Sequence, residues 1–374
     1  MIRVLVAEDS HAVRLFLISL LESDAEIQVV GQVADGQSAV DSVRLLRPDV
    51  ITMDIHMPKL DGLEATARIM HEVPTPIVVV SSTVDARDVA SSFDAMKAGA
   101  LVALPKPGAS SDRQAEYDRQ NFVSTVKAMS KVKVVRRWSG AFNTVPPRGP
   151  PPGLKGTATS ADFHHHFTAD GSIGTPSSAA RSSASARRLP AALIAIAAST
   201  GGPSALQRVL SALPGTFPAP IILVQHIARG FLPGFAAWLD SECVLRVKVA
   251  EALEPLLAGT VYVAPDDHHL GVSASRRVQR ISGDPVNGFC PSASVLFQSA
   301  ADAYGASLVS VILTGMGSDG VSGLRRVKAR GGYVIAQDEA TSLIYGMPGE
   351  ALIAGVTDVM LPIDEIADHL LTLV

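Results

Sequence analysis

Residues 192–206 read ALIAIAASTGGPSAL, and this stretch holds a strand, a turn and the start of a helix. The apolar run at 192–197 indicates a buried strand. Gly201 and Gly202 favour a turn after it, and Pro203 suits the first turn of a helix, where its missing N–H needs no partner. A strand followed directly by a helix is the unit from which parallel sheets are built.

The same alternation recurs on both sides of a central segment. In the C-terminal half we expect strands at 192–197, 220–225, 308–313 and 333–337. In the N-terminal half we expect strands at 3–7, 27–33, 49–53, 77–80 and 101–104. Longer amphipathic segments separate these runs and predict helices. The sequence therefore predicts an α/β protein with two doubly wound parallel sheets.

The central segment, residues 136–189, has a different composition. Its 54 positions include six prolines, six glycines and eight serines, with few large aliphatic residues. Such a segment cannot bury enough apolar surface to offset the entropy of ordering the chain. We therefore predict a disordered, flexible linker at 136–189 between domains at 1–135 and 190–374.

The composition excludes several classes of protein. Of 374 residues 47% are apolar and 18% charged, a balance typical of globular chains. A net charge of −4 gives little attraction to nucleic acid or to anionic membranes. Two cysteines are too few for a disulfide scaffold, and no signal peptide or membrane span is evident. We expect a cytoplasmic protein with no nucleic-acid partner and no inserted segment.

Acidic residues follow two of the predicted N-terminal strands. Glu8 and Asp9 follow the first strand and Asp54 follows the third, so a parallel sheet would gather the three carboxylates at one edge. Mg²⁺ would neutralise them, because it prefers oxygen ligands. Ser81 and Lys106 end two further strands, and a carboxylate, metal, hydroxyl and ammonium together can accept and hold a phosphoryl group. An acid at a strand end can also be a simple helix cap.

These positions lie in motifs that resemble the response-regulator receiver family. The motifs are VLVAEDS (4–10), MDIHMPKLDG (53–62), VVVSS (78–82) and LPKP (104–107). The resemblance implies a flavodoxin-like fold in which Asp54 is phosphorylated. It implies that Glu8, Asp9 and Asp54 bind Mg²⁺ together with the backbone carbonyl of His56. It also implies that Ser81 is the switch hydroxyl and that Lys106 contacts the phosphoryl group.

Three reactive side chains follow predicted strands in the C-terminal half. Ser199, His226 and Asp319 would meet at one sheet edge as nucleophile, base and orienting acid of an acyl transfer. Glycines around Met316 would leave backbone N–H groups free to face an oxyanion. The residues alone leave two alternatives open. The turn at 199–202 can also be a helix cap or a phosphate cradle, and His226 can be a packed core histidine.

Residues 192–374 resemble the catalytic domain of CheB-type chemotaxis protein-glutamate methylesterases. The resemblance rests on IAIAASTGGPSAL (194–206), VQHIARGFLPGFAAWL (224–239), VYVAPDDHHL (261–270), PSASVLFQSAA (291–301), ILTGMGSDGVSGL (312–324), GGYVIAQDEATSLIYGMPGEA (331–351) and VMLPIDEIA (359–367). It implies that Ser199 is the nucleophile, His226 the base and Asp319 the orienting acid. It also implies that Met316 supplies an oxyanion N–H and that Thr200 helps to position His226. The segment at 289–290, Phe-Cys here, is more often charged or polar in that family.

The two resemblances together imply a phosphorylation-activated enzyme. Its substrates would be glutamate γ-methyl esters, and also glutamines, of methyl-accepting chemotaxis receptors, and a chemotaxis histidine kinase would be the phosphodonor. The esterase reaction would need no cofactor. Two alternatives remain at this point: a phosphorylation-switched receptor-binding module with a vestigial esterase site, and a nucleotide-binding effector domain that uses the turn at 199–202.

Overall fold

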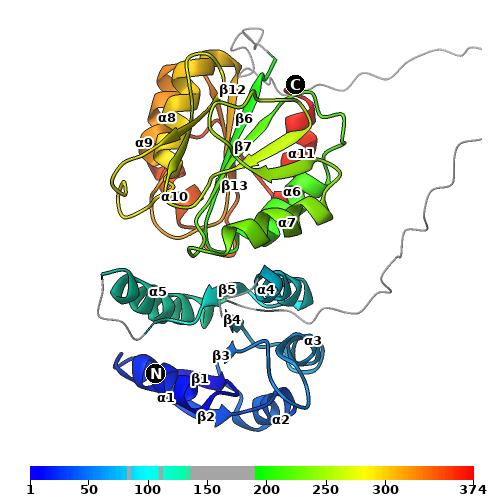
Figure 1. The fold of residues 1–374 in the computed structure, drawn as a ribbon, viewed down its shortest axis with the longest axis vertical. Coiled ribbons are helices and arrows are strands. Elements are labelled where there is room, and N and C mark those ends of the chain that lie inside the picture. Colours follow the sequence, from blue (N-terminus) through cyan, green and yellow to red (C-terminus); the bar gives the residue numbers. More distant parts are fainter. Residues whose placement is uncertain (82–85, 109–112, 133, 135–189) are drawn as a thin grey trace, which may run out of the picture. The chain divides into compact units, whose positions relative to one another are not determined.

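The computed structural model describes residues 1–81, 86–108, 113–132, 134 and 190–374 (Figure 1). The linker predicted at 136–189 lies outside these residues, so it stays a prediction. Within the described ranges the chain forms two parallel sheets and one short antiparallel hairpin. The prediction of two doubly wound parallel sheets is confirmed, and the hairpin was not predicted. None of the helices in these ranges combines the length and the apolar character needed to cross a membrane.

The N-terminal sheet has the strand order β2-β1-β3-β4-β5. Its strands are β1 (Ile2–Ala7), β2 (Ile27–Val33), β3 (Val50–Met53), β4 (Ile77–Ser81) and β5 (Val102–Pro105). Its helices are α1 (His11–Glu22), α2 (Gly36–Leu46), α3 (Gly62–Glu72), α4 (Ala86–Ala98) and α5 (Arg113–Met129). The chain order reverses between β1 and β3, and crevices for ligands form at the carboxyl ends of strands beside such a reversal.

Helices cover both faces of this sheet, as the alternation along β1 shows. Val4 and Val6 are fully buried in a core that includes residues of α1 and α5. Leu5 and Ala7 point the other way, into a core with residues of α2 and α3. Because both faces are buried from Val4 onward, the strand is apolar from there to Ala7. Its one charged residue, Arg3, is exposed near the start of the strand, and Glu8 and Asp9 follow its end.

The C-terminal sheet has the strand order β14-β13-β12-β6-β7-β9-β8, and every pairing in it is parallel. Its strands are β6 (Leu193–Ala198), β7 (Ile221–Gln225), β8 (Arg246–Val249), β9 (Thr260–Val263), β12 (Leu308–Ile312), β13 (Tyr333–Gln337) and β14 (Val359–Leu361). Its helices are α6 (Gly202–Ser211), α7 (Leu232–Glu242), α8 (Ala293–Tyr304), α9 (Val321–Ala329), α10 (Met347–Ile353) and α11 (Ile363–Leu371), with a 3₁₀ turn at Gly305–Ser307. The antiparallel hairpin pairs β10 (His269–Val272) with β11 (Val278–Ile281).

The central strand β6 determines how this sheet is covered. Ile194 and Ile196 pack into a core with α6, α7 and α11 residues, and Leu193 and Ala195 pack into a core with α8, α9 and α10 residues. Figure 1 shows the two helix groups on opposite faces of the sheet. β6 lies between β12 and β7, so the residues that follow these three strands reach one edge side by side.

The strands at the centre of the sheet match the sequence expectation to within one residue at each end. The expectation missed β8, β9, β14 and the hairpin. β8 and β11 carry exposed charged residues, and β14 has only three residues, all half-buried. These three strands therefore lack the continuous apolar run on which the prediction relied. β9 and β10 are buried throughout but have only four residues each, and Thr260 and His269 open them with polar side chains.

Helix α9 packs against α8 at a point that only glycine fits. A Cβ placed on Gly323 would lie 2.5 Å from the carbonyl oxygen of Ser294 and 2.8 Å from the Cβ of Phe297. We expect Gly323→Ala to lower the free energy of unfolding by about 1–3 kcal/mol, despite the better helix propensity of alanine. Chemical denaturation measures this change. Ser322→Ala, at the exposed neighbouring position, should change it by less than about 0.5 kcal/mol, and equal effects of the two would contradict the packing argument.

Candidate functional site

Three neighbouring strands of the C-terminal sheet bring Ser199, His226 and Asp319 to one edge. Ser199 follows β6 and His226 follows β7 directly, and Asp319 lies in the loop between β12 and α9. Backbone hydrogen bonds continue the ladder past the strand ends, from Ser199 N to Thr314 O (3.0 Å) and from His226 N to Ala198 O (2.9 Å). The relative positions of these loops are therefore fixed by the sheet.

His226 and Asp319 form a buried hydrogen-bonded pair. The Nε2 atom of His226 lies 2.9 Å from Asp319 Oδ2, and the two side chains are 8% and 0% exposed. An ionised carboxylate can only accept, so Nε2 carries the proton in the neutral imidazole and Nδ1 carries a free lone pair. Nδ1 is buried and has no hydrogen-bond partner in the described part of the chain. This nitrogen is therefore free to accept a proton.

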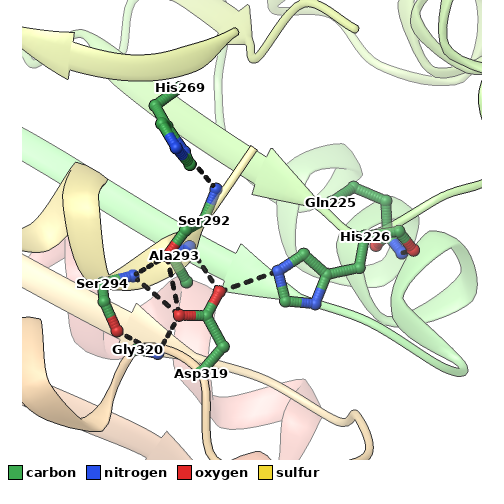
Figure 2. A network of polar contacts seen from close by, with 8 residues as sticks. All are labelled: Gln225, His226, His269, Ser292, Ala293, Ser294, Asp319 and Gly320. Atoms are coloured by element: carbon green, nitrogen blue, oxygen red, sulfur yellow. Dashed lines mark hydrogen bonds and ion pairs between the residues drawn. The ribbon is translucent and has the colours of Figure 1, made fainter. Parts of the chain in front are cut away.

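Asp319 also accepts hydrogen bonds from the start of helix α8 (Figure 2). Ser292 Oγ donates to it at 2.8 Å, and the backbone N–H groups of Ala293 and Ser294 donate at 2.7 and 3.2 Å. A further bond comes from Gly320 N at 2.9 Å. Burial alone would raise the pKa of Asp319. The hydrogen bond and charge of His226 lower it, and the hydrogen bonds of Ser292 and Ser294 add to this effect, so that the pKa is about 2. The carboxylate is therefore ionised at neutral pH.

A second layer of hydrogen bonds holds the donors themselves. Ser292 N donates to Nδ1 of His269 at 3.1 Å, and the other ring nitrogen of His269 lies 3.1 Å from the carbonyl of Asp284. Gly320 N also donates to Ser294 Oγ at 2.8 Å. Figure 2 shows His269, Ser292 and Ser294 grouped on the side of Asp319 away from His226. They restrict the carboxylate to one orientation.

Phe289 covers one face of the His226 ring. The two rings are stacked, with centroids 4.1 Å apart and planes inclined by 11°. Phe289 lies in the same loop as Ser292, so one segment contacts both the imidazole and the carboxylate.

The remaining predicted residues lie at the same edge without direct contact to His226. No hydrogen bond joins Ser199 Oγ to His226 in the described residues, as is common where the substrate is absent. The carbonyl of Thr200 accepts a bond from Thr314 Oγ1 at 2.9 Å, and no described contact joins Thr200 to His226. Met316 N–H donates to no acceptor among the described residues, and Gly315 O before it accepts from two backbone N–H groups. The roles predicted for Ser199, Thr200 and Met316 stay predictions.

A second polar site lies at the carboxyl edge of the N-terminal sheet. Lys106 Nζ lies 3.0 Å from Asp54 Oδ2 and 2.9 Å from a carboxylate oxygen of Glu8. Ligand oxygens of Glu8, Asp9 and Asp54 lie within 4.8 Å of one another. Ser81 is buried at the end of β4, and its carbonyl accepts from Lys106 N at 2.9 Å. His56, also predicted here, is exposed two residues after Asp54.

The electrostatics of this acidic site favour an added cation. Burial raises the pKa of Asp54, and burial together with the charge of Asp54 raises the pKa of Glu8, despite the opposing effect of Lys106. Three carboxylates thus face one ammonium group. The donor set consists of oxygens, which Mg²⁺ prefers, so the residues present fit the predicted ion.

Two residues of the C-terminal site were not predicted. Ser292 directly bonds Asp319, and Gln225 bonds the backbone carbonyls of both Ser199 and His226. The available signal was weak: Gln225 is a polar residue at the end of a buried apolar strand, and Ser292 is a serine that precedes a helix. Neither pattern by itself distinguishes a catalytic loop from an ordinary cap.

Family models match both parts of the chain. Residues 194–370 match the CheB methylesterase model, and residues 4–116 match the response regulator receiver domain model. Together the two matches span the two parallel sheets described above.

Curated relatives are similar along nearly the full chain. A protein-glutamate methylesterase/protein-glutamine glutaminase of Myxococcus xanthus is 45% identical over 99% of this chain and 96% of its own length. One from Anaeromyxobacter dehalogenans is 46% identical over 99% and 98%. The crystal structure of the Thermotoga maritima CheB methylesterase catalytic domain is 40% identical over 50% of this chain and 100% of that chain, with a TM-score of 0.48.

The low pKa of Asp319 predicts a pH-dependent contribution of Ser292 to stability. A carboxylate whose pKa falls from 3.8 to about 2 on folding stabilises the fold above pH 4, and this contribution is lost as the pH falls through 2. Ser292→Ala should therefore lower the free energy of unfolding by about 1.5–3 kcal/mol at neutral pH, and by progressively less between pH 4 and pH 2.

Denaturant titrations across this pH range measure the effect, and Ser299→Ala is the matched control on the same helix. Ser299 Oγ bonds only neutral backbone groups, Val272 N and Leu296 O, so its contribution should not change with pH. If Ser292→Ala lowered the free energy of unfolding by the same amount at every pH, the stabilising bond from Ser292 to the ionised carboxylate would be contradicted.

Proposed function

The chain belongs to the CheB methylesterase family, with a response regulator receiver domain in front, and we propose that it is a phosphorylation-activated protein-glutamate methylesterase. Its substrates are glutamate γ-methyl esters on chemotaxis receptors, and it also deamidates receptor glutamines. The observation that carries the proposal is the buried His226–Asp319 pair, whose free Nδ1 lies at the edge that Ser199 shares. Neutral imidazole and ionised carboxylate are the states that acyl transfer requires.

Acylation begins with Ser199. Its Oγ attacks the ester carbonyl carbon, and Nδ1 of His226 takes the hydroxyl proton. Asp319 stabilises the imidazolium through the Nε2–H bond and keeps the ring in one tautomer. The oxyanion faces the backbone N–H of Met316, which donates to no described acceptor. The imidazolium then protonates the methoxide oxygen, the C–O bond breaks, and methanol leaves a γ-glutamyl ester on Ser199.

Deacylation repeats these steps with water. Nδ1 of His226 takes a proton from water, whose oxygen attacks the acyl carbon, and the imidazolium returns a proton to Ser199 Oγ as the bond to it breaks. The product is a free glutamate side chain. When the substrate is glutamine, ammonia replaces methanol as the leaving group, and every residue keeps its role. Phe289 lies against the ring throughout and limits the access of bulk water to that face.

Asp54 is the proposed phosphoryl acceptor. Its carboxylate oxygen attacks the phosphorus of the donor as the bond from phosphorus to the donor's imidazole nitrogen, or to the acetate oxygen of acetyl phosphate, breaks and that group leaves. Lys106, already 3.0 Å away, pairs with the phosphoryl oxygens. Glu8, Asp9, Asp54 and the carbonyl of His56 would hold Mg²⁺, which neutralises charge between the carboxylates and the incoming group when bound. The Ser81 hydroxyl is the proposed switch contact. The added charge then shifts the receiver between two states and activates the esterase.

We propose that the protein acts in the cytoplasm on methyl-accepting chemotaxis receptors and that a chemotaxis histidine kinase phosphorylates it. The esterase reaction uses only side chains and backbone groups of the protein. A binding module with a vestigial esterase site is disfavoured, because a vestigial site has no need of a buried carboxylate held by five hydrogen-bond donors.

We expect Ser199→Ala to abolish methanol release from methylated receptor membranes, because no other group replaces the attacking hydroxyl. Wild-type release should rise when acetyl phosphate and Mg²⁺ are added. The variant should still take up phosphate at Asp54, which shows that the N-terminal domain folds, and its thermal unfolding should match that of the wild type, which shows that the C-terminal domain folds. Equal release by wild type and Ser199→Ala would favour the binding-module alternative.

We expect Asp54→Asn to prevent phosphorylation and activation without removing basal esterase activity. The amide cannot form the acyl phosphate, whereas the groups at Ser199 are unchanged. Radiolabelled acetyl phosphate measures incorporation, and methanol release measures activation in the same samples. Asp61→Asn is a matched control, because Asp61 is an exposed helix cap beside the acidic site. Full labelling of Asp54→Asn would place the phosphorylation elsewhere.

A further inference from the structure

Gln225 lies between the two chain segments that carry Ser199 and His226. It is the last residue of β7, it pairs in register with Ala198 at the end of β6, and its side chain is 2% exposed. Figure 2 shows its carboxamide beside the backbone of His226. A polar side chain in this buried position needs hydrogen-bond partners that justify its desolvation.

The two N–H groups of its amide go to the two catalytic segments. Gln225 Nε2 donates to the backbone carbonyl of Ser199 at 2.9 Å and to that of His226 at 2.8 Å. Both partners are hydrogen-bond acceptors, so the nitrogen of the carboxamide must face them. In the flipped orientation Oε1 would lie against the two carbonyl oxygens, with no proton between them. One amide group therefore joins the backbone of the nucleophile to the backbone of the base.

The other end of the carboxamide is packed rather than hydrogen-bonded. Gln225 Oε1 is buried and has no hydrogen-bond partner among the described residues. A Cβ placed on Gly202 would lie 2.0 Å from this oxygen, so glycine is required for the carboxamide to fit. An unpaired buried oxygen is unfavourable. The bonds made by Nε2 are thus what the side chain contributes at this position.

We propose that Gln225 is a positioning residue that sets the distance and orientation of Ser199 relative to His226. This inference rests on the proposed function, because it takes Ser199 as nucleophile and His226 as base. Acyl transfer needs the reacting atoms about 3–3.5 Å apart, and a shift of about 1 Å can lower the rate about 100-fold. Without the amide, the two carbonyls lose their shared donor and the loops lose this connection.

Two substitutions of similar size separate positioning from packing. Gln225→Met keeps the volume and removes both donors, and we expect kcat for methanol release to fall about 100-fold with KM nearly unchanged. Gln225→Glu keeps the shape, and its buried carboxyl group facing two carbonyl oxygens will have a raised pKa. The protonated form has one O–H donor and restores one bond, whereas the ionised form restores none.

The pH profile of Gln225→Glu is therefore the decisive measurement. We expect kcat of Gln225→Glu, divided by kcat of the wild type, to fall at least 10-fold as the pH rises from 6 to 8.5. The same ratio for Gln225→Met should be low and independent of pH. A role in packing alone predicts a constant ratio for both variants, and that result would overturn the proposal.

Gly202→Ala tests the same contact from the other side. The added methyl group must displace Oε1, so kcat should fall in this variant although every hydrogen-bonding group is retained. Thermal unfolding of each variant shows that the domain is folded. A folded Gly202→Ala or Gln225→Met with wild-type kcat would overturn the proposal.

The rate at which a fluorophosphonate labels Ser199 is measured in parallel. This reagent needs the activated hydroxyl and no receptor, so it reports on positioning even if the receptor substrate has been assigned incorrectly. We expect labelling of Gln225→Met to slow about as much as kcat. If Gln225→Met were labelled at the wild-type rate, the inference would be overturned. If instead the wild-type protein were labelled but released no methanol from receptors, the proposed function would have failed.

Discussion

The backbone ladder between β6 and its two neighbours determines the geometry of the esterase site. It extends beyond the strands, through His226 N to Ala198 O on one side and Ser199 N to Thr314 O on the other. Parallel strands end at one edge of a sheet, so this ladder brings the segments of Ser199 and His226 side by side before any side chain takes part. Side-chain contacts then refine an arrangement that the sheet has already made. The Gln225 amide makes the most direct of these side-chain contacts, because its one nitrogen bonds the backbone carbonyls of both segments, at Ser199 and at His226.

The two polar edges of this protein treat buried carboxylates in opposite ways. Asp319 receives five hydrogen-bond donors, and its pKa is lowered to about 2. Asp54 and Glu8 share the single ammonium of Lys106, and burial raises the pKa of both. The first carboxylate is fully satisfied by the protein and needs no ligand. The second pair is under-neutralised, which suits a site where a cation and a phosphoryl group are added and removed.

The sequence predicted those features that depend on a continuous buried pattern. The central strands and the residues directly after them, such as Ser199 and His226, were identifiable because an apolar run ends abruptly in polar residues. The hairpin β10–β11 was not identifiable, because its exposed positions interrupt the pattern. Ser292 and Gln225 were missed for a different reason. Their importance lies in the groups they bond: Ser292 bonds the carboxylate of Asp319, 27 residues away, and Gln225 bonds the carbonyl of Ser199, 26 residues away.

The loop before α8 explains how substrate preference can change without loss of the chemistry. The loop and the first turn of α8 contact both members of the pair: Phe289 lies on the ring of His226, and Ala293 and Ser294 bond Asp319 through their backbone N–H groups. Backbone donors do not depend on the identity of the side chain, so the ionisation of Asp319 tolerates sequence change at these two positions. Phe289 contacts His226 through its side chain, which covers one face of the imidazole ring. A substitution there alters the surface that an incoming ester or amide meets, whereas the charge that stabilises the imidazolium stays in place.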